Sequence, residues 1–548
     1  MAKTPFPDAI RRQASDIQNH ILDEYVARRL DRRQFLRHAS IMGMIPLLGG
    51  LPILGASAAR AADAAPGGDI RVALTTPAGA VDPVTSADAA GATLLQQSGE
   101  FLVMDDPDLT LRPALATAWS ANADATIWTF TLRRNVTFHS GKAFTADDVV
   151  ATMDRLADPK VASNALSVFQ GVLSKGNTHR VDDYTVAFHL DAPNGNFPYY
   201  VSSDNYNAII LPASYAGGYE KTFDGTGPFK LDRYTPKVGA SFVRSDAYWG
   251  PKALPDRVDF TFYDDQQSQI LAMQAGGVDV VAQFSVQGGQ ALLNNPAVSV
   301  IALRSSAHNQ VHMRCDMDPF KDKRVRRAMA LTLNRTGLVK GLFRGESDIG
   351  NDSPFAPVFP STNPSIPQRQ QDLNEAKQLL EAAGVKPGTE VNLTTEQFIE
   401  IPGYAVLLQD WAKAIGIKIN LKIETQSAYY GNATFGQSDW LDVQMGITDY
   451  AHRGVPNVLL AAPLLSNGAW NAAHFKNPDY DRLVGQFVGA VDLQTQRDIS
   501  GKIETLLLDE TPIIFGYFYK FLTATSTKLA GVRSAATSQL FLDRAHFV

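Results

Sequence analysis

The chain has 548 residues, of which 45% are hydrophobic and 19% are charged, and both values are typical of a folded globular protein. At roughly 100–200 residues per domain, this length predicts two or three domains, each able to bury a core. The formal net charge is −6. An acidic chain without a basic stripe excludes nucleic acid as the expected partner. The single cysteine, Cys315, excludes an internal disulfide and a structural zinc cluster.

The first 61 residues have the layout of an export signal. A charged region comes first and contains Asp31-Arg32-Arg33-Gln34-Phe35-Leu36-Arg37. A mildly apolar stretch over residues 41–59 follows, and then a small-x-small pattern at Ala59-Arg60-Ala61. This order is typical of a signal peptide, and paired arginines followed by Phe-Leu resemble the twin-arginine signal. We therefore expect export to the periplasm by that route, with cleavage near Ala61 and a soluble mature protein, rather than a permanent membrane anchor.

Four segments further along the chain have the pattern of strands. Apolar and polar side chains alternate over residues 127–132, 186–190, 258–262 and 417–423. Such alternation predicts strands with one buried face. No unit repeats at a fixed period, which argues against a solenoid or a propeller.

Helical patterns lie between these strands. Thr145 begins a capping box, and Asp372 is in the position of an N-cap for a helix that Gly384 closes. A third helix is expected from about Tyr404 to Ile415. Because strands and helices alternate, the fold class is predicted to be α/β.

A series of motifs resembles one family of binding proteins. The first and most specific block is Leu111-Arg112-Pro113-Ala114-Leu115-Ala116, Trp119-Ser120, Trp128-Thr129-Phe130-Thr131-Leu132-Arg133 and Val136-Thr137-Phe138-His139-Ser140-Gly141-Lys142-Ala143-Phe144-Thr145-Ala146-Asp147-Asp148-Val149. Later blocks, in chain order, are Gly225-Thr226-Gly227-Pro228-Phe229-Lys230, Asp246-Ala247-Tyr248-Trp249-Gly250, Gly277-Val278-Asp279, Phe320 to Ala328, Asn374 to Gly384 and Asn477-Pro478-Asp479-Tyr480-Asp481. These blocks resemble the peptide-type (family 5) extracellular solute-binding proteins of ATP-binding-cassette (ABC) importers, in the family's order.

The resemblance implies a hinged, two-lobed periplasmic binding protein of the class II or cluster C type. On this reading residues 62–305 and 520–548 form the first lobe, with an extra subdomain at about 113–215, and residues 306–519 form the second lobe. The implied function is to capture a peptide or another amine-bearing small solute between the lobes and to deliver it to an ABC permease. The protein is then expected to be a monomer, to carry no cofactor or metal, and not to be an enzyme.

The resemblance also suggests ligand-binding residues near Asp449. In peptide-binding relatives an aspartate in an Asp-x-x-Asp-Pro-like stretch holds the ligand's α-amino group, and Asp449 takes the first aspartate's place. A buried ammonium needs a carboxylate partner to offset its desolvation. The second aspartate is missing here, and Arg453 could instead bind a ligand carboxylate or phosphate. A third possibility is that Asp449 and Arg453 pair with each other.

Aromatic side chains of the same region are candidate walls of the cleft, because they offer apolar faces with polar tips. The expected ligand-binding set is completed by Tyr450, Trp470, Asn471, Tyr429 and Trp440. In relatives, the loop that reaches the ligand from the first lobe lies in the segment that corresponds to residues 75–88. The sequence does not indicate which of these residues would contact the ligand.

Other functions remain open at this stage. The same fold could bind an opine, a sugar or a metal chelate, or could present its ligand to a signalling receptor. An exported hydrolase is the alternative of a different class, but the chain has no Gly-x-Ser-x-Gly and no zinc-helix motif. His308 and His312 would lie roughly 13 Å apart on an extended segment, too far for one metal ion.

Overall fold

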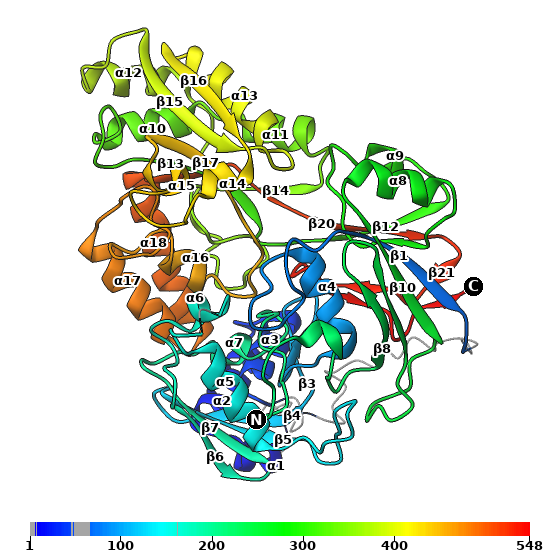
Figure 1. The fold of residues 1–548 in the computed structure, drawn as a ribbon. Coiled ribbons are helices and arrows are strands. Elements are labelled where there is room, and N and C mark those ends of the chain that lie inside the picture. Colours follow the sequence, from blue (N-terminus) through cyan, green and yellow to red (C-terminus); the bar gives the residue numbers. More distant parts are fainter. Residues whose placement is uncertain (1–5, 7, 45–47, 49–65, 162) are drawn as a thin grey trace.

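The structure, a computed structural model, describes residues 6, 8–44, 48, 66–161 and 163–548. Its described part is organised around two large sheets that lie in different halves of the molecule (Figure 1). We call the half built on the seven-stranded sheet the first lobe. The half built on the five-stranded sheet, from β13 to β19, is the second lobe.

The seven-stranded sheet is mixed, since β1 pairs in parallel with β10 and β11, and the other pairs are antiparallel. In sheet order its strands are β12 (Val298–Leu303), β20 (Phe521–Ser526), β11 (Val280–Val281), β1 (Asp69–Thr75), β10 (Arg257–Tyr263), β9 (Gly239–Arg244) and β8 (Phe229–Thr235). The chain leaves this sheet after β12 and returns to it at β20, so two segments connect the lobes.

The second lobe has an α/β layer structure. In sheet order its strands are β16 (Ile417–Glu424), β15 (Thr389–Glu396), β17 (Met445–Tyr450), β13 (His308–Met313) and β18 (Ile513–Phe515). Its main helices are α10 (Lys323–Leu331), α11 (Arg335–Leu342), α12 (Leu373–Ala382), α13 (Ile401–Lys413), α17 (Pro478–Gly489) and α18 (Leu493–Glu510). The last strand of the lobe, β19 (Tyr517–Tyr519), pairs with β14 (Ser347–Ile349).

A smaller antiparallel sheet belongs to the first lobe. Its strands are β4 (Ala116–Ala121), β5 (Ile127–Leu132), β7 (Thr185–His189) and β6 (Thr178–Asp182), and α5 (Ala146–Leu156) packs on it. The short helix α7 (Phe197–Tyr200) leads from this sheet to the interface between the lobes.

The α/β prediction is confirmed, and so are the strands predicted from alternation. The N-cap role of Asp372 is also confirmed, because its carboxylate accepts the amide hydrogens of Asn374 and Glu375. The helix expected from Tyr404 begins earlier, at Ile401. Pro402 fits the first turn of a helix, where an amide hydrogen has no partner in the helix.

Residues 8–41 form α1 (Asp8–Gln13), α2 (Asp16–Val26) and α3 (Arg32–Ile41), which lie against the first lobe (Figure 1). Apolar side chains of α2 and α3 belong to the same buried cluster as the first lobe's core. The predicted cleavage site at Ala59-Arg60-Ala61 lies outside the described residues. The expectation that residues 1–61 are a signal peptide therefore stays a prediction.

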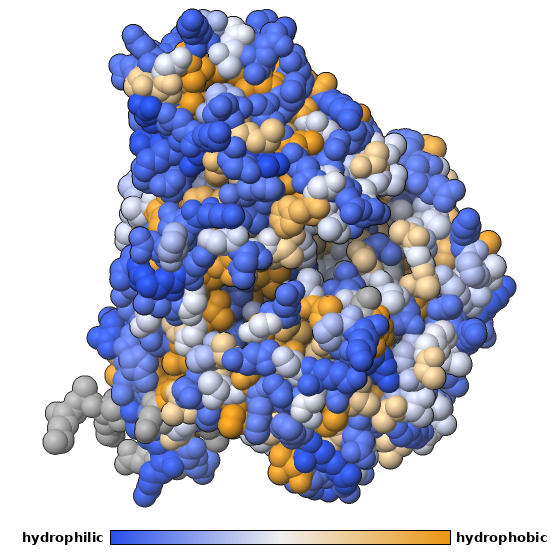
Figure 2. Space-filling view, turned by 60° about the vertical axis from the view of Figure 1, so that its left-hand side comes forward, coloured by the Kyte–Doolittle hydropathy of each residue, from blue (hydrophilic) through white to orange (hydrophobic). Residues whose placement is uncertain are grey.

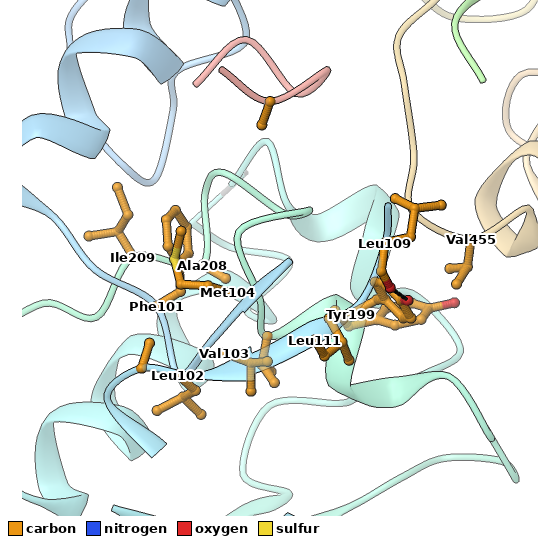
Figure 3. Close-up of a cluster of buried hydrophobic side chains, with 14 of the residues drawn as sticks. Phe101, Leu102, Val103, Met104, Leu109, Leu111, Tyr199, Ala208, Ile209 and Val455 are labelled. Atoms are coloured by element: carbon orange, nitrogen blue, oxygen red, sulfur yellow. Dashed lines mark hydrogen bonds between the residues drawn. The ribbon is translucent and has the colours of Figure 1, made fainter. Parts of the chain in front are cut away.

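Buried side chains from distant parts of the chain meet where the lobes join. Figure 3 shows Tyr199 beside Leu109, whose carbonyl accepts the Tyr199 hydroxyl, and Val455 of the second lobe lies next to them. All three belong to the larger of the two main apolar clusters. The other cluster underlies the five-stranded sheet.

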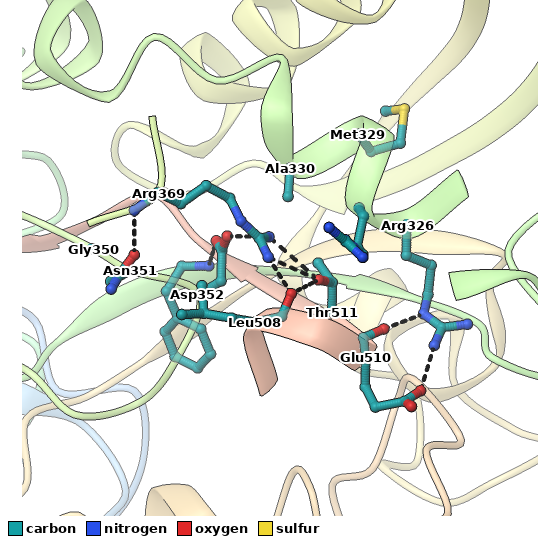
Figure 4. Close-up of polar contacts among 12 residues, drawn as sticks. Arg326, Met329, Ala330, Gly350, Asn351, Asp352, Arg369, Leu508, Glu510 and Thr511 are labelled. Atoms are coloured by element: carbon teal, nitrogen blue, oxygen red, sulfur yellow. Dashed lines mark hydrogen bonds and ion pairs between the residues drawn. The ribbon is translucent and has the colours of Figure 1, made fainter. Parts of the chain in front are cut away.

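A network of ion pairs fixes the second lobe. Asp352 is fully buried and pairs with Arg335 and Arg369, each at 2.7 Å. Arg369 also contacts Thr511, at the end of α18 (Figure 4). Two cations face one carboxylate here, so the negative charge of Asp352 is compensated within the protein.

Candidate ligand-binding site

A cavity of about 190 Å³ lies between the lobes. The first lobe contributes Ala87, Asn164, Ser167, Val168, Tyr199, Tyr200, Asp204, Asn205, Tyr206 and Asn207, and the second lobe contributes Ala451, Arg453, Val455, Val458 and Trp470. In Figure 2 the surface is hollowed between the two halves of the molecule, with apolar side chains beside the hollow. A cavity with walls from both lobes, aromatic faces and a few charged groups suits a small solute.

An acidic and a basic side chain line this cavity from opposite lobes. Asp204 is only 6% exposed and accepts the amide hydrogen of Gly454. Burial raises its pKa above the ordinary value, and the nearby Asp105 carboxylate raises it further. Arg453 donates from Nη1 to the carbonyl of His452, while its buried Nε has no hydrogen-bond partner among the described residues. The cavity therefore contains hydrogen-bonding capacity that the described protein groups do not use.

His452, next to Arg453, has a supporting position. Its Nδ1 accepts the amide hydrogen of Ser306 at 3.0 Å, which holds the loop after β17 against the segment that enters the second lobe. Burial lowers the pKa of His452 to about 3, so the ring is neutral at physiological pH.

Asp449 lies on β17, two residues before Ala451 of the cavity wall. Its Oδ1 accepts hydrogen bonds from Asn309 Nδ2 and Tyr519 Oη, both at 2.8 Å. Its backbone amide donates to Glu396. Burial is the main cause that raises the pKa of Asp449 to about 7, and the Glu396 carboxylate adds to it.

The surroundings of Asp449 are acidic. Glu396 is fully buried and accepts hydrogen bonds from Tyr430 Oη at 2.8 Å and Gln426 Nε2 at 2.7 Å. Burial also raises the pKa of the nearby Glu400 to about 7. Within the described residues, no ion pair reaches Asp449, Glu396 or Glu400. This acidic cluster, next in sequence to the cavity residue Ala451 through Asp449, would therefore attract a cation.

The structure separates Asp449 and Arg453. Asp449 accepts hydrogen bonds from neutral side chains, and Arg453 donates to the carbonyl of His452. In the part of the chain that the structure describes, the two residues form no ion pair with each other. The possibility that they neutralise each other is therefore not realised in this arrangement. Asp449 therefore has no cationic partner among the described residues, and Arg453 faces the Asp204 carboxyl across the cavity.

The aromatic candidates fall into two groups. Trp470 lines the cavity, and its ring contacts that of Tyr450 at 6.0 Å and that of Trp440 at 6.5 Å. Tyr429, Trp440 and Tyr450 are buried in one small cluster behind it. Tyr429 Oη lies 2.9 Å from Thr448 Oγ1, inside the second lobe.

Asn471 lies in a tight turn. Its Nδ2 donates to the carbonyls of Leu465 and Phe475, and its Oδ1 accepts the amide hydrogen of Phe475. This set of bonds holds the turn that positions Trp470. The ligand-binding roles expected for these residues stay predictions.

Of the first-lobe residues that line the cavity, only Ala87 lies in the segment that was expected to reach the ligand. The first-lobe residues that were not predicted are Asn164, Ser167, Val168, Tyr199, Tyr200 and the run from Asp204 to Asn207. One signal was present: a polar run, Ser202 to Asn207, interrupts two apolar segments. The contact from Gly454 to Asp204 spans 250 positions, which no local pattern reveals.

The comparisons with known proteins identify the family. A family model described as bacterial extracellular solute-binding proteins, family 5 Middle, matches residues 110–466. The periplasmic murein peptide-binding protein MppA of Escherichia coli is 26% identical over 80% of this chain and 85% of its own length. Heme-binding protein A of Haemophilus influenzae is 25% identical over 74% of this chain and 78% of its own length. Dipeptide-binding protein DppE of Bacillus subtilis is 27% identical over 77% of this chain and 81% of its own length.

Solved structures share the fold. The substrate-binding protein CtaP of Listeria monocytogenes aligns with a TM-score of 0.77 at 21% identity, over 88% of this chain and 99% of its own. A dipeptide-binding protein of a Pseudoalteromonas species in complex with Met-Leu aligns with a TM-score of 0.74 at 20% identity, over 88% of this chain and 100% of its own. The predicted two-lobed binding-protein fold is thereby confirmed.

No helix in the described ranges is both long and apolar enough to cross a membrane. In those ranges no three side chains of His, Cys, Asp or Glu come together as a metal site. The matched family consists of solute-binding proteins, which are transport components and not enzymes, so the hydrolase alternative is excluded. This chain belongs to the family 5 extracellular solute-binding proteins of bacteria.

Proposed function

We propose that this chain is the periplasmic binding component of an ABC importer and that it captures a short peptide, or another small solute with an amine, between its lobes. The observation that carries the proposal is a pair of side chains of opposite charge on the second lobe: Arg453 lines the interlobe cavity, and Asp449 lies two residues before the cavity residue Ala451, and within the described residues neither forms an ion pair. A peptide with free termini has one positive and one negative end. It therefore matches both positions.

Asp449 is the proposed partner of the ligand's ammonium group. Among the described residues, only the neutral donors Asn309 and Tyr519 bind its carboxylate, and Glu396 and Glu400 raise its pKa through their negative charge. A cation placed there recovers Coulomb energy that the free protein lacks. The family motif at the same position supports this role.

Arg453 is the proposed partner of a ligand carboxylate. Its Nε has no partner among the described residues, although it is buried, and burying an unsatisfied donor costs about 1–3 kcal/mol. A carboxylate could accept from Nε and one Nη together, in the bidentate geometry that a guanidinium favours. Trp470 would then cover an apolar part of the ligand.

Ligand contacts to both lobes explain closure. A solute that touches the first lobe at Tyr199–Asn207 and the second lobe at Arg453 has more contacts in the closed form than in the open form. This difference shifts the population toward the closed form. A permease that recognises the closed form would thereby receive loaded protein.

The relatives' names support a peptide but also include haem. Several relatives of this chain are called dipeptide-, tripeptide- or murein peptide-binding proteins, and one is called heme-binding. The two unpaired charges favour the peptide. Export by the twin-arginine route, a monomeric state and an ABC permease as partner belong to the same proposal.

A thermal-shift screen of the purified protein tests the proposal. The panel holds di- and tripeptides, the same peptides with acetylated N-termini, opines, neutral oligosaccharides and haem. Ligand at about 100 times its Kd should stabilise the protein by about 2.7 kcal/mol, and free peptides should give this shift while their acetylated forms do not. A shift with haem or oligosaccharides and none with any amine would refute the proposal.

A further inference from the structure

We infer that residues 8–44 form a docking segment that binds the folded first lobe and, through Arg37, reaches the wall of the interlobe cavity. The inference does not rest on the identity of the ligand. It concerns the chain before any cleavage after residue 44. The bound partner is thus a segment of this chain, and the surface that receives it lies on β3 (Leu111–Pro113), β4 and α7.

Backbone and hydroxyl contacts fix the end of α3 on the first lobe. Trp119 Nε1 donates to the carbonyl of Ile41 at 2.7 Å, and the amide of Leu111 donates to Ser40 Oγ at 2.9 Å. Gly43 follows with φ of +67°, and a Cβ there would lie 2.0 Å from the Trp119 carbonyl oxygen. Only glycine allows this approach, so the fit is specific in shape as well as in hydrogen bonding.

The apolar face of the segment is buried on the first lobe. Phe35 is 0% exposed: its ring packs against the N-terminal rings of Phe6 and Tyr25, with centroids 5.6 Å and 4.4 Å away, and it belongs to the same buried cluster as the first lobe's core. The buried apolar side chains of the segment are Ile21, Leu22, Leu30, Phe35, Ala39, Ile41, Met42 and Met44. Burial of this many apolar groups gives the association its main driving force.

Arg37 connects the segment to both lobes. It is 5% exposed, with Nε donating to Tyr199 Oη and Nη2 to the Gly454 carbonyl, both at 3.0 Å. Its guanidinium also lies over the Tyr199 ring at 5.5 Å. Tyr199 lines the cavity, and Gly454 lies between the cavity residues Arg453 and Val455. An arginine buried this deeply needs these partners, because its desolvation is costly without them.

The second lobe also contacts the segment at α18. His20, Ile21, Glu24, Arg29, Leu30 and His38 line one small cavity together with Asp492, Leu493, Gln494 and Arg497. The docked segment therefore touches the lobes on both sides of their joint. Docking also divides the arginine-rich stretch: Arg32 and Arg33 stay exposed, whereas Phe35 and Arg37 are buried.

A cleavage experiment on the full chain tests the inference. A recognition sequence for a specific protease is inserted between Ala61 and Ala62, the purified chain is cut, and the products are separated by size exclusion at micromolar concentration. The fragment with residues 1–61 should elute with the rest of the chain. Hydrogen exchange over residues 199–207 and 451–456 should remain slow in the cut complex.

Variants separate specific docking from nonspecific retention. Phe35→Asp would place a carboxylate in the apolar cluster and should weaken retention about a hundredfold, and Arg37→Met should weaken it about tenfold. Arg33→Ala, on the exposed side of α3, is the matched control and should retain the fragment. In the variants that release it, exchange over residues 199–207 and 451–456 should rise.

Two results would overturn the inference. The first is elution of the wild-type fragment by itself after cutting, while the remainder of the chain unfolds at its normal temperature. The second is retention that is equal in wild type, Phe35→Asp and Arg33→Ala, because this would show that the fragment adheres without the contacts described.

Discussion

Two carboxylates of the second lobe, the buried Asp352 and the half-buried Asp449, have opposite surroundings. Asp352 lies between Arg335 and Arg369, so its charge is compensated inside the protein. In the part of the chain that the structure describes, the carboxylate of Asp449 is bound only by the neutral donors Asn309 and Tyr519. A compensated charge holds the fold together, whereas a carboxylate without an ion-pair partner, two residues from the cavity wall, can accept a cation from outside.

The largest expected effect belongs to the compensated site. Asp352→Asn leaves Arg335 and Arg369 buried without their counter-charge, and should lower the free energy of unfolding by about 3–5 kcal/mol. Urea denaturation followed by circular dichroism measures the loss. Glu390→Gln removes an exposed pair with Lys418 and, as the control, should change stability by less than about 1 kcal/mol. An equal loss of unfolding free energy in Asp352→Asn and Glu390→Gln would show that the buried ion pairs of Asp352 stabilise the fold no more than an exposed pair does.

Asp449→Asn should have the reverse profile. Its unfolding free energy should change little, because an amide can keep the bonds from Asn309 and Tyr519 through its carbonyl oxygen. Its affinity for a free dipeptide should fall more than about tenfold, since the ammonium loses its counter-charge. Titration calorimetry measures the affinity, and Asp439→Asn, at an exposed acid of the same lobe, is the control. Unchanged affinity in Asp449→Asn would assign the amine to another group.

The pH dependence of binding should report the same carboxylate. Burial raises the pKa of Asp449 to about 7, with Glu396 and Glu400 adding to the rise and Tyr519 and Asn309 opposing it. An ammonium ligand needs the ionised form, so affinity should fall as pH drops below about 7, approaching tenfold per unit. The sign for stability is opposite, because a raised carboxyl pKa stabilises the free protein at low pH and this contribution is lost as pH rises through 7. A dipeptide affinity that is flat from pH 8 to 5 would contradict the assignment.

Arg453→Gln is expected to have the smallest effect. It should weaken binding of peptides with a free carboxyl end about tenfold and leave the C-terminally amidated peptides unchanged, because only the former present an acceptor of matching charge. Competition binding with the two peptide forms measures the difference. An equal loss for both forms would indicate a structural role for Arg453 in place of a ligand contact.

The sequence predicted well what depends on neighbours along the chain. The alternation at residues 127–132 gave a strand, and Asp372 could be recognised as an N-cap because its partners are two and three residues away. The family motifs led to the two-lobed fold and to Asp449. The first-lobe wall of the cavity could not be predicted, since Asp204 meets Gly454 only in the folded chain.

The N-terminal segment illustrates the same limit. Phe35 and Arg37 fit an export signal by their spacing, and nothing in that spacing indicates that Phe35 is enclosed by aromatic rings or that Arg37 reaches Tyr199. Burial and hydrogen bonding across 162 positions decide this contact. They depend on the tertiary fold.

A double-mutant cycle tests the central claim most directly. Calorimetry measures a dipeptide and its N-acetylated form on wild type and on Asp449→Asn. If the ammonium binds Asp449, each single change should cost more than about tenfold in affinity, and the two together should cost hardly more than either alone. Losses that simply add would show that the amine and Asp449 act independently, and would contradict the proposed site.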